Sequence, residues 1–441
     1  MDRGLQFEVP GLFFLCFQPI DFVGEHSSSA PASYGSMVHS ALKAHHAGKI
    51  EEALDLAERC IRMSDGSDFA GHVVVSEVLY RAGRVDELDE FLGKSTAFHS
   101  DPCCQIMLAR VHRLRGAWAE CERTLRPLLP RPLPQSLRRI CGFELVKALD
   151  AQGRYSECWE AAATVHRETA KPFAMDLLVA ALKMTAEISA SELKKVRRAS
   201  RGIPNTACIL GMPRSGTSLL EQMLDCHSAI CGRGESGLPG QIGDSIAKLG
   251  GGWPVGVLNV TVAALDQFQG LYRNALRTAV NLPDDIWSID KTVFPQMQPL
   301  VIACVLPNAK VIRIVRNSKD NAISLFLNNL DPSWGWTSSL ESIRALLKAE
   351  REYIPTICEK LGIDIVSIQF ESLVGNPDQT LKGVIDHLGL SWEESCLRPD
   401  RNPRLVQTLS NEQVRQPLNN RGIGRWTHYA EHFDARWDEI T

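Results

Sequence analysis

A short segment after residue 206 carries residue types that bind an anion. Residues 207–211 read as an apolar strand, residues 212–218 as a small polar loop, and an apolar helical pattern follows. Such a strand, tight loop and helix direct several backbone N–H groups and the positive end of the helix at one point, which suits a phosphate or sulfate group. The predicted anion-binding residues are Arg214, Ser215, Gly216, Thr217 and Ser218.

The composition of this loop indicates which anion it holds. The spacing from Gly211 to Gly216 equals that of a Walker A loop, yet Thr217 stands where a nucleoside-triphosphate enzyme has Lys. An ATPase is therefore disfavoured. The replacement suits a donor without a γ-phosphate, because Arg214 offers a forked guanidinium and Thr217 and Ser218 offer hydroxyls.

Residues 213–218 resemble the 5′-phosphosulfate loop of sulfotransferases that use 3′-phosphoadenosine 5′-phosphosulfate (PAPS). They are most similar to the loops of the tyrosylprotein sulfotransferases and of their bacterial relatives with tetratricopeptide (TPR) repeats. The resemblance implies a transferase that moves a sulfuryl group from PAPS, its co-substrate, to a hydroxyl acceptor. It implies no metal ion.

Two later segments agree with the resemblance. An apolar strand pattern ends at Arg316, and Ser324 follows eight residues later; in the family, an Arg and a Ser at these places hold the 3′-phosphate of the donor. Residues 408–417 and the basic Arg425 before Trp426 resemble the segment that closes over the nucleotide in this family.

Sulfuryl transfer is an in-line displacement, which needs a base for the acceptor hydroxyl and a donor for the leaving bridge oxygen. The resemblance assigns the base to Glu235, which lies in a Gly-rich loop 21 residues after Arg214. It assigns stabilisation of the leaving group to Lys291 and Ser410. His227 is the alternative base, since many small-molecule sulfotransferases use His, although a packing role is favoured for it.

Three departures from the tyrosylprotein enzymes leave the acceptor open. Gly237 stands where those enzymes have an Arg that helps to bind acidic peptides, Phe370 replaces a Tyr on the donor side, and Asn328 replaces an Arg near the 3′-phosphate. The expected acceptor is therefore a hydroxyl of a peptide, a carbohydrate, a lipid or a small molecule.

The elements before residue 200 form a separate pattern of consecutive amphipathic helices. Glycines at 48, 83, 116 and 153 recur at intervals of 35, 33 and 37 residues, each in a similar frame between two helices. A period near 34 residues resembles TPR repeats, and a plain helical bundle is the alternative. The repeats are expected to bind a protein partner, to self-associate, or only to support the catalytic half.

The net charge, the apolar run near the N-terminus and the cysteines indicate the cellular location and the kinds of partner. The net charge of −4 gives no whole-molecule attraction to nucleic acid, and the apolar run at residues 11–17 is shorter than the roughly 18 residues of a membrane span. The sequence has thirteen cysteines and no Cys-x-x-Cys pair, which indicates reduced structural thiols. A cytoplasmic protein is expected, without nucleic acid, metal site or membrane span.

The predicted architecture is an all-α TPR-like repeat domain followed by an α/β, P-loop-like sulfotransferase domain with a central parallel sheet. The expected boundaries are a poorly ordered leader at 1–35, repeats at 36–200 and the sulfotransferase domain at 201–441. Two alternatives remain: a nucleotide or small-molecule kinase that uses the same loop, and a TPR scaffold whose α/β half has lost catalysis.

Overall fold

A computed structural model describes residues 32–46, 49–63, 69–95, 98–292, 298–402, 404 and 418–440. The described residues form two compact units. The helical unit holds residues up to 172 together with 327–338, and the α/β unit holds residues 173–326 and 339–440. The leader expected at residues 1–35 lies outside the described residues as far as 31, and the first helix begins at Ala32.

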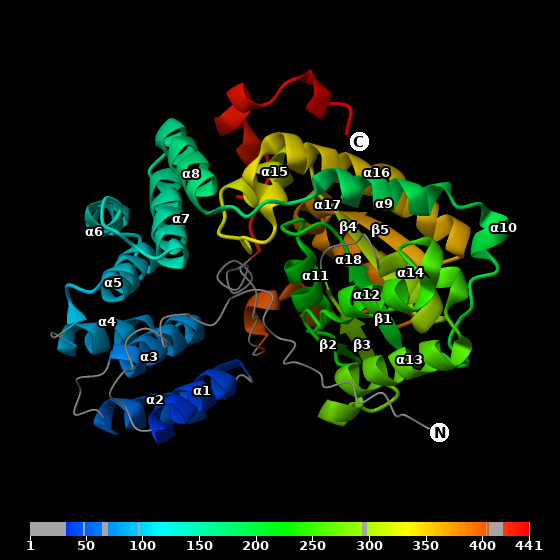
Figure 1. The fold of residues 1–441 in the computed structure, drawn as a ribbon, viewed down its shortest axis with the longest axis horizontal. Coiled ribbons are helices and arrows are strands. Elements are labelled where there is room, and N and C mark those ends of the chain that lie inside the picture. The colour runs from blue at the N-terminus through cyan, green and yellow to red at the C-terminus, as the bar shows by residue number, and fades with distance from the viewer. Residues whose placement is uncertain are drawn as a thin grey trace. The chain divides into compact units, whose positions relative to one another are not determined.

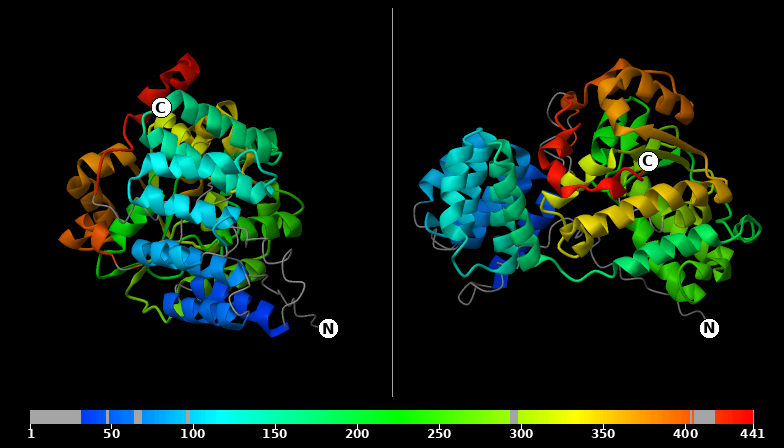
Figure 2. Two further views of the ribbon diagram at one scale, coloured as in Figure 1. Left: turned by 90° about the vertical axis from the view of Figure 1, so that its left-hand side faces the viewer. Right: turned by 90° about the horizontal axis from the view of Figure 1, so that it is seen from above.

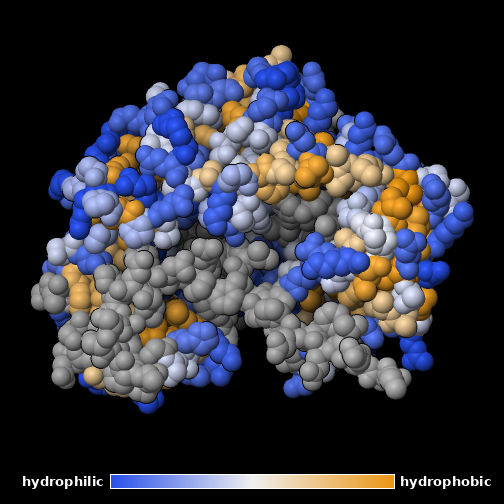
Figure 3. Space-filling view, in the orientation of Figure 1, coloured by the Kyte–Doolittle hydropathy of each residue, from blue (hydrophilic) through white to orange (hydrophobic). Residues whose placement is uncertain are grey.

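The N-terminal region is all-helical in its described residues, as predicted. Neighbouring helices pack on one another in sequence order, so that successive hairpins stack (Figures 1 and 2). Their bounds are α1 (Ala32–His46), α2 (Ile50–Met63), α3 (Phe69–Ala82), α4 (Val85–Lys94), α5 (Pro102–Leu114), α6 (Trp118–Leu125), η3 (Arg126–Leu128), α7 (Gln135–Ala151) and α8 (Tyr155–Thr169). On the face drawn in Figure 3 the surface of these helices is mainly hydrophilic.

The recurring glycines end one helix of a hairpin and allow the next to begin. Gly83, Gly116 and Gly153 have φ values of 74°, 73° and 72°, in the left-handed region that favours glycine. The equivalence of the three values supports a structural repeat. Gly48 lies outside the described residues.

The core of the helical unit includes a buried ionic network. The side chain of Arg110 contacts Glu77 of α3 at 3.1 Å and Glu144 of α7 at 3.3 Å, and Arg113 contacts Glu144 at 2.8 Å. Burial alone would raise the pKa of Glu77, but Arg81 and Arg110 lower it to about 2. The network therefore joins three helices through ionised groups that satisfy one another.

A short segment from the C-terminal half of the sequence completes the helical unit. Arg139 of α7 donates to Asn329 Oδ1 at 2.9 Å and to the carbonyl of Leu330 at 3.0 Å. Trp336, in the 3₁₀ helix η6 (Gly335–Ser338), is 1% exposed. Residues 327–338 thus fold with the helices that precede them by more than 150 positions, which no local pattern predicts.

The α/β unit contains five parallel strands in the order β2-β3-β1-β4-β5 among the described residues (Figure 1). The strands are β1 (Thr206–Leu210), β2 (Ile230–Gly232), β3 (Trp287–Asp290), β4 (Lys310–Val315) and β5 (Ile365–Gln369). This confirms the predicted parallel sheet. The strands β2 and β3 lie on one side of β1, and the later strands β4 and β5 lie on the other side. Where the strand order reverses in this way, a crevice opens at the carboxyl ends of the strands.

Helices cover both faces of this sheet. One face packs Ile209 and Ile314 against Leu220 of α11 and Leu381 of α18. On the other face Arg313 of β4 pairs with Glu350 of α16 at 2.8 Å. The helices are α11 (Thr217–Leu224), α12 (Leu238–Gly250), α13 (Val262–Leu276), α14 (Gln298–Val305), α15 (Ser318–Phe326), α16 (Leu340–Leu361), α17 (Phe370–Gly375) and α18 (Pro377–Leu388). None of the helices in the described ranges is long and apolar enough to span a membrane.

Two helices expected to end the repeat region pack in the α/β unit instead. The helix α9 (Met175–Glu187) lies along α16 (Figure 1), and α10 (Ala190–Leu193) also contacts α16. Lys360 of α16 donates to the carbonyl of Ile188 at 3.1 Å. By compactness the chain therefore divides near residue 173, whereas the change to a strand pattern and the matched motifs placed the expected boundary near residue 200.

A truncation tests this division. A fragment of residues 173–441 keeps α9 on α16, whereas a fragment of 200–441 exposes the surface that buries Leu182 and Ala186. Loss of this apolar burial is expected to give the shorter fragment lower solubility and a lower Tm. Thermal unfolding and the soluble yield of the two fragments measure the difference. Equal behaviour would show that α9 is not part of the α/β core.

Candidate functional site

The phosphate-type loop joins β1 to α11 at the carboxyl edge of the sheet. A Cβ at Gly211 would lie 2.8 Å from Ser215 Oγ and 2.9 Å from the carbonyl oxygen of Ile314, so that only glycine fits. Gly216 has a φ of 105°, and Arg214 has a φ of 67°, a left-handed conformation that a side chain disfavours. The loop is thus a strained, closely packed turn whose shape depends on its glycines.

Two arginines and a serine meet over this loop. Arg316 follows β4 directly; its Nη1 donates to the carbonyl of Arg214 at 2.8 Å and its Nη2 to the carbonyl of Gly422 at 2.5 Å. Arg214 Nε donates to Ser324 Oγ at 3.1 Å. The structure therefore brings together Arg214, Arg316 and Ser324, although 110 positions separate Arg214 from Ser324.

Electrostatics favour an anion at this cluster. Burial, together with the charges of Arg316 and Arg425, lowers the pKa of Arg214 to about 10. Burial also lowers the pKa of Arg316 to about 10, while Asp320 and Glu371 partly oppose the effect. Because Arg425 acts on both pKa values, three cations share one region, and a bound anion would relieve their repulsion.

Unsatisfied polar atoms show that the loop fits a phosphate or sulfate group. Ser215 is 1% exposed, and its Oγ has no hydrogen-bond partner among the described residues. Arg316 Nε is likewise buried and unpaired within the same part of the chain. The helix α11 begins at Thr217, and the first N–H groups of a helix lack intrahelical partners. These donors suit the oxygens of a phosphate or sulfate group.

Glu235 and Lys291 form an ion pair next to the loop. Lys291 follows β3, is fully buried, and its Nζ lies 2.5 Å from Glu235 Oε1. The same Nζ donates to Ser218 Oγ at 3.3 Å. Lys291 thereby connects the first turn of α11 with Glu235, which follows β2. A base and a cation next to an anion site can serve a group transfer.

Two buried carboxylates hold the loop that carries Glu235. Glu221 of α11 accepts from the N–H of Gly234 at 2.6 Å, and Asp290 accepts from Ser236 Oγ at 2.7 Å. Burial raises the pKa of Asp290, although its hydrogen bonds oppose the shift. The residues on either side of Glu235 are thus fixed. Sequence reasoning missed both carboxylates; the position of Asp290 immediately before Lys291 was the available signal.

His227 and Glu235 lie on opposite sides of β2 in the chain. His227 Nδ1 accepts from the N–H of Ala229 at 3.0 Å, and Nε2 lies 2.8 Å from the carbonyl oxygen of Ser391. Both ring nitrogens are therefore engaged within the fold. This arrangement favours a packing role for His227 over the role of base.

The remaining predicted residues have different outcomes. Ser410 and the segment 408–417 lie outside the described residues. Phe370 begins α17 and its ring lies 4.8 Å from the guanidinium carbon of Arg316, an attractive cation–π contact. Gly237 precedes α12 with a φ of 66°, a conformation that disfavours the Arg of the tyrosylprotein enzymes.

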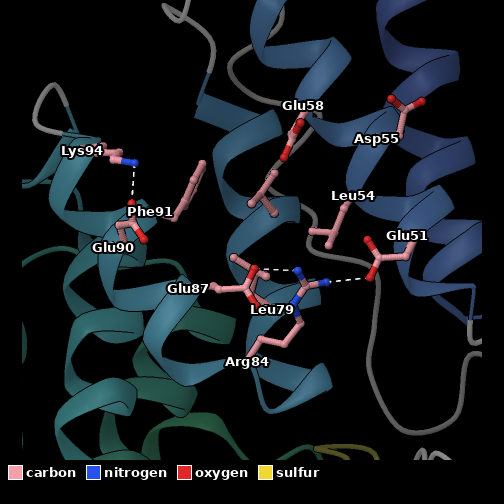
Figure 4. A pocket seen from close by; sticks show the side chains of 11 residues that line it. Glu51, Leu54, Asp55, Glu58, Leu79, Arg84, Glu87, Glu90, Phe91 and Lys94 are labelled. Atoms are coloured by element: carbon pink, nitrogen blue, oxygen red, sulfur yellow. Dashed lines mark hydrogen bonds and ion pairs between the residues drawn. The ribbon is translucent and has the colours of Figure 1, made fainter.

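A separate groove lies on the helical unit and has a volume of 390 Å³ (Figure 4). Arg84 contacts Glu51 at 2.8 Å and Glu87 at 2.5 Å, and Lys94 contacts Glu90 at 2.6 Å. The other two carboxylates of the lining, Asp55 and Glu58, contact Arg59 and Arg62. Because each of these five carboxylates already contacts a cationic side chain, we interpret the groove as a solvated polar surface and not as a binding site.

The fold and the site together agree with one family. Residues 207–394 match the model of the sulfotransferase family. The match agrees with the resemblance that the sequence motifs indicated.

Similar proteins support a distant relation to the tyrosylprotein sulfotransferases. An uncharacterized protein of Aquifex aeolicus is 25% identical over 370 residues, which are 80% of this chain and 48% of that protein. Protein-tyrosine sulfotransferase of Drosophila melanogaster is 22% identical over 49% of this chain and 46% of its own length. Protein-tyrosine sulfotransferase 2 of Gallus gallus is 22% identical over 49% of this chain and 61% of its own length. The chain thus spans about half to under two thirds of these relatives.

Two solved structures are also similar. The sulfotransferase domain from the curacin biosynthetic pathway has a TM-score of 0.35 and 17% identity, over 54% of this chain and 97% of that domain. Mouse sulfotransferase SULT7A1 complexed with PAP has a TM-score of 0.32 and 17% identity, over 58% of this chain and 87% of that enzyme.

Proposed function

We propose that this protein transfers a sulfuryl group from PAPS to the hydroxyl of an acceptor. The observation that carries the proposal is the cluster of Arg214, Arg316 and Ser324 at the strand ends, next to the buried pair of Glu235 and Lys291. The first group suits the anionic ends of a nucleotide, and the second suits proton transfer and charge stabilisation.

PAPS, when bound, supplies an activated sulfuryl group and leaves as adenosine 3′,5′-bisphosphate (PAP). The phosphosulfate would be held by the loop residues Arg214, Ser215, Gly216, Thr217 and Ser218. Arg316, Ser324 and Arg425 would hold the 3′-phosphate, because a doubly charged group suits clustered guanidiniums.

The acceptor side depends on Glu235 and Lys291. Glu235 would take the proton from the acceptor hydroxyl, and Lys291 would stabilise the negative charge on the leaving oxygen. Ser410 shares the second role by its resemblance to the family. A kinase is the weaker proposal, since Thr217 replaces the Lys that holds the β- and γ-phosphates.

The donor is tested by calorimetry with PAP, adenosine 5′-phosphate and ATP, each with and without magnesium. We expect PAP to bind more tightly than adenosine 5′-phosphate or ATP, without a magnesium requirement. The reason is that only PAP carries the 3′-phosphate that Arg316 and Ser324 are proposed to bind. At 100 times its Kd, PAP should stabilise the fold by about 2.7 kcal/mol. Magnesium-dependent ATP binding without PAP binding would replace the proposal by a kinase, and no nucleotide binding would favour the scaffold.

The acceptor class is open between peptide, carbohydrate, lipid and small-molecule hydroxyls. A transfer assay with labelled sulfate on PAPS, run against one member of each class, identifies it. Labelled product that depends on both PAPS and the acceptor would establish the reaction. PAP binding without transfer to any member would leave a donor-binding protein of another role.

A further inference from the structure

Asp320 occupies a central place between the two residues assigned to the 3′-phosphate. It lies in the first turn of α15, four positions after Arg316 and four before Ser324, and is 2% exposed. Buried carboxylates are costly unless their oxygens accept hydrogen bonds. The partners of Asp320 therefore indicate what it does.

Both carboxylate oxygens of Asp320 bind the backbone around Arg425. Oδ2 accepts from the N–H of Gly424 at 2.7 Å, and Oδ1 accepts from the N–H of Trp426 at 2.9 Å. The residues immediately before and after Arg425 are thus tied to one side chain. Gly424 has a φ of 72°, which allows the chain to turn so that both N–H groups reach Asp320.

A neighbouring contact strengthens this attachment. Lys319 Nζ lies 4.4 Å from the ring centre of Trp426 and 2.6 Å from Asp438 Oδ1. The start of α15 therefore binds residues on both sides of Arg425 and a later part of the C-terminal segment. These contacts of Lys319 and Asp320 are called the tether below. They join α15 to a segment that is more than 100 positions away in the sequence.

The tether works against charge repulsion. Arg425 lowers the pKa of both Arg214 and Arg316, so its cation lies close enough to repel theirs. Without a ligand, this repulsion favours displacement of Arg425. The negative charge of Asp320 by itself would weaken the binding of an anion nearby. A carboxylate at this place therefore favours binding only if it also positions a residue that binds the anion.

We propose that Asp320 is a positioning residue that holds Arg425 in the donor site. Its effect on the nucleotide is indirect: it fixes the backbone of Arg425 so that the guanidinium can bind the 3′-phosphate of the donor. This inference rests on the proposed function. It extends the site beyond the residues that the family resemblance assigns.

The test is PAP affinity in four variants measured by calorimetry. Asp320→Asn keeps the volume but places an N–H₂ group against one backbone N–H, and we expect PAP binding to weaken about 10-fold or more, as Arg425→Ala should. The double variant should equal Arg425→Ala alone. Glu371→Gln is the matched control, because Glu371 also lies near Arg316 yet accepts from the N–H of Asn317; its affinity should stay equal or rise.

The sign of the effect decides the proposal. Tighter binding of PAP by Asp320→Asn would mean that Asp320 acts through its charge alone, and unchanged binding would mean that it does not affect the donor site; either result would overturn the proposal. Additional loss of affinity on top of Arg425→Ala would also overturn it, because the effect would then not pass through Arg425. If the wild-type protein binds no PAP, the proposed function fails, and the tether is judged by hydrogen exchange.

Hydrogen exchange examines the tether without a ligand, and its first measurement needs only the wild-type protein. In the wild-type protein the amides of Gly424 and Trp426 should exchange slowly, and in Asp320→Asn at least one of them should exchange faster. Fast exchange of both amides in the wild type would overturn the proposal even if Asp320→Asn did not fold. Thermal unfolding of each variant shows whether a loss of affinity is only a loss of folded protein.

Discussion

Replacing Glu235 by Gln is expected to lower kcat by about 10²–10⁴-fold and to leave PAP affinity nearly unchanged. Gln keeps an oxygen that can accept from Lys291 Nζ, which lies 2.5 Å from Glu235 in the wild type. The substitution therefore preserves the position of Lys291 while it removes the group that is proposed to take the proton. Binding and turnover should separate for this reason.

The measurement is steady-state transfer to the acceptor found in the panel, with PAP affinity by calorimetry on the same preparations. Glu393→Gln is the matched control, because Glu393 accepts from the N–H of Ser228 at 2.8 Å, before β2 rather than after it. Its kcat should stay near wild type. Near-normal turnover of Glu235→Gln would remove Glu235 as the base, and equal losses of affinity and rate would mark it as structural.

Replacing Arg316 by Ala is expected to weaken PAP binding by about 2–4 kcal/mol, which is roughly 30- to 900-fold in Kd. The guanidinium binds the carbonyls of Arg214 and Gly422, so the substitution removes the proposed phosphate contact and also loosens two sides of the site. Arg316→Lys keeps the charge but loses the fork, and its affinity should lie between those of the wild type and the Ala variant.

Arg313→Lys is the matched control for this position. Arg313 lies on β4, the strand that Arg316 directly follows, and is also buried, but it contacts Glu350 on the other face of the sheet. Its replacement is expected to change the Tm and not the Kd for PAP. An Arg316→Ala protein that is folded and has wild-type affinity would contradict the assignment of Arg316 to the donor.

The anion site could be predicted because each of its parts is encoded in a contiguous stretch. Residues 207–224 contain a strand, a loop with two required glycines and a helix, and the physical chemistry of that unit does not depend on distant residues. Arg316 and Ser324 were assigned by their resemblance to the family, on a strand and helix pattern that is equally local. The all-helical region could be predicted for the same reason, because its helical periodicity and its recurring glycines are local patterns.

The relations between distant segments could not be predicted in this way. Glu235 and Lys291 are 56 positions apart and meet because β2 pairs with β3 in parallel, and a strand pattern does not state which neighbour it takes. Asp320 accepts hydrogen bonds from the backbone N–H groups of Gly424 and Trp426, on either side of Arg425, and backbone contacts leave no residue signature. The role of His227 became apparent only from the partners of its two nitrogens.

The sequence, with its resemblance to the family, therefore predicted the chemistry of the candidate site: an anion loop, a second arginine at a strand end and a carboxylate in a Gly-rich loop. The tertiary structure decided which of these residues touch, which carboxylates hold them, and that residues 327–338 fold with the helical unit while α9 folds with the sheet. The physical reason is that local patterns fix secondary structure, whereas burial and hydrogen bonding between remote segments depend on the order in which strands and helices pack.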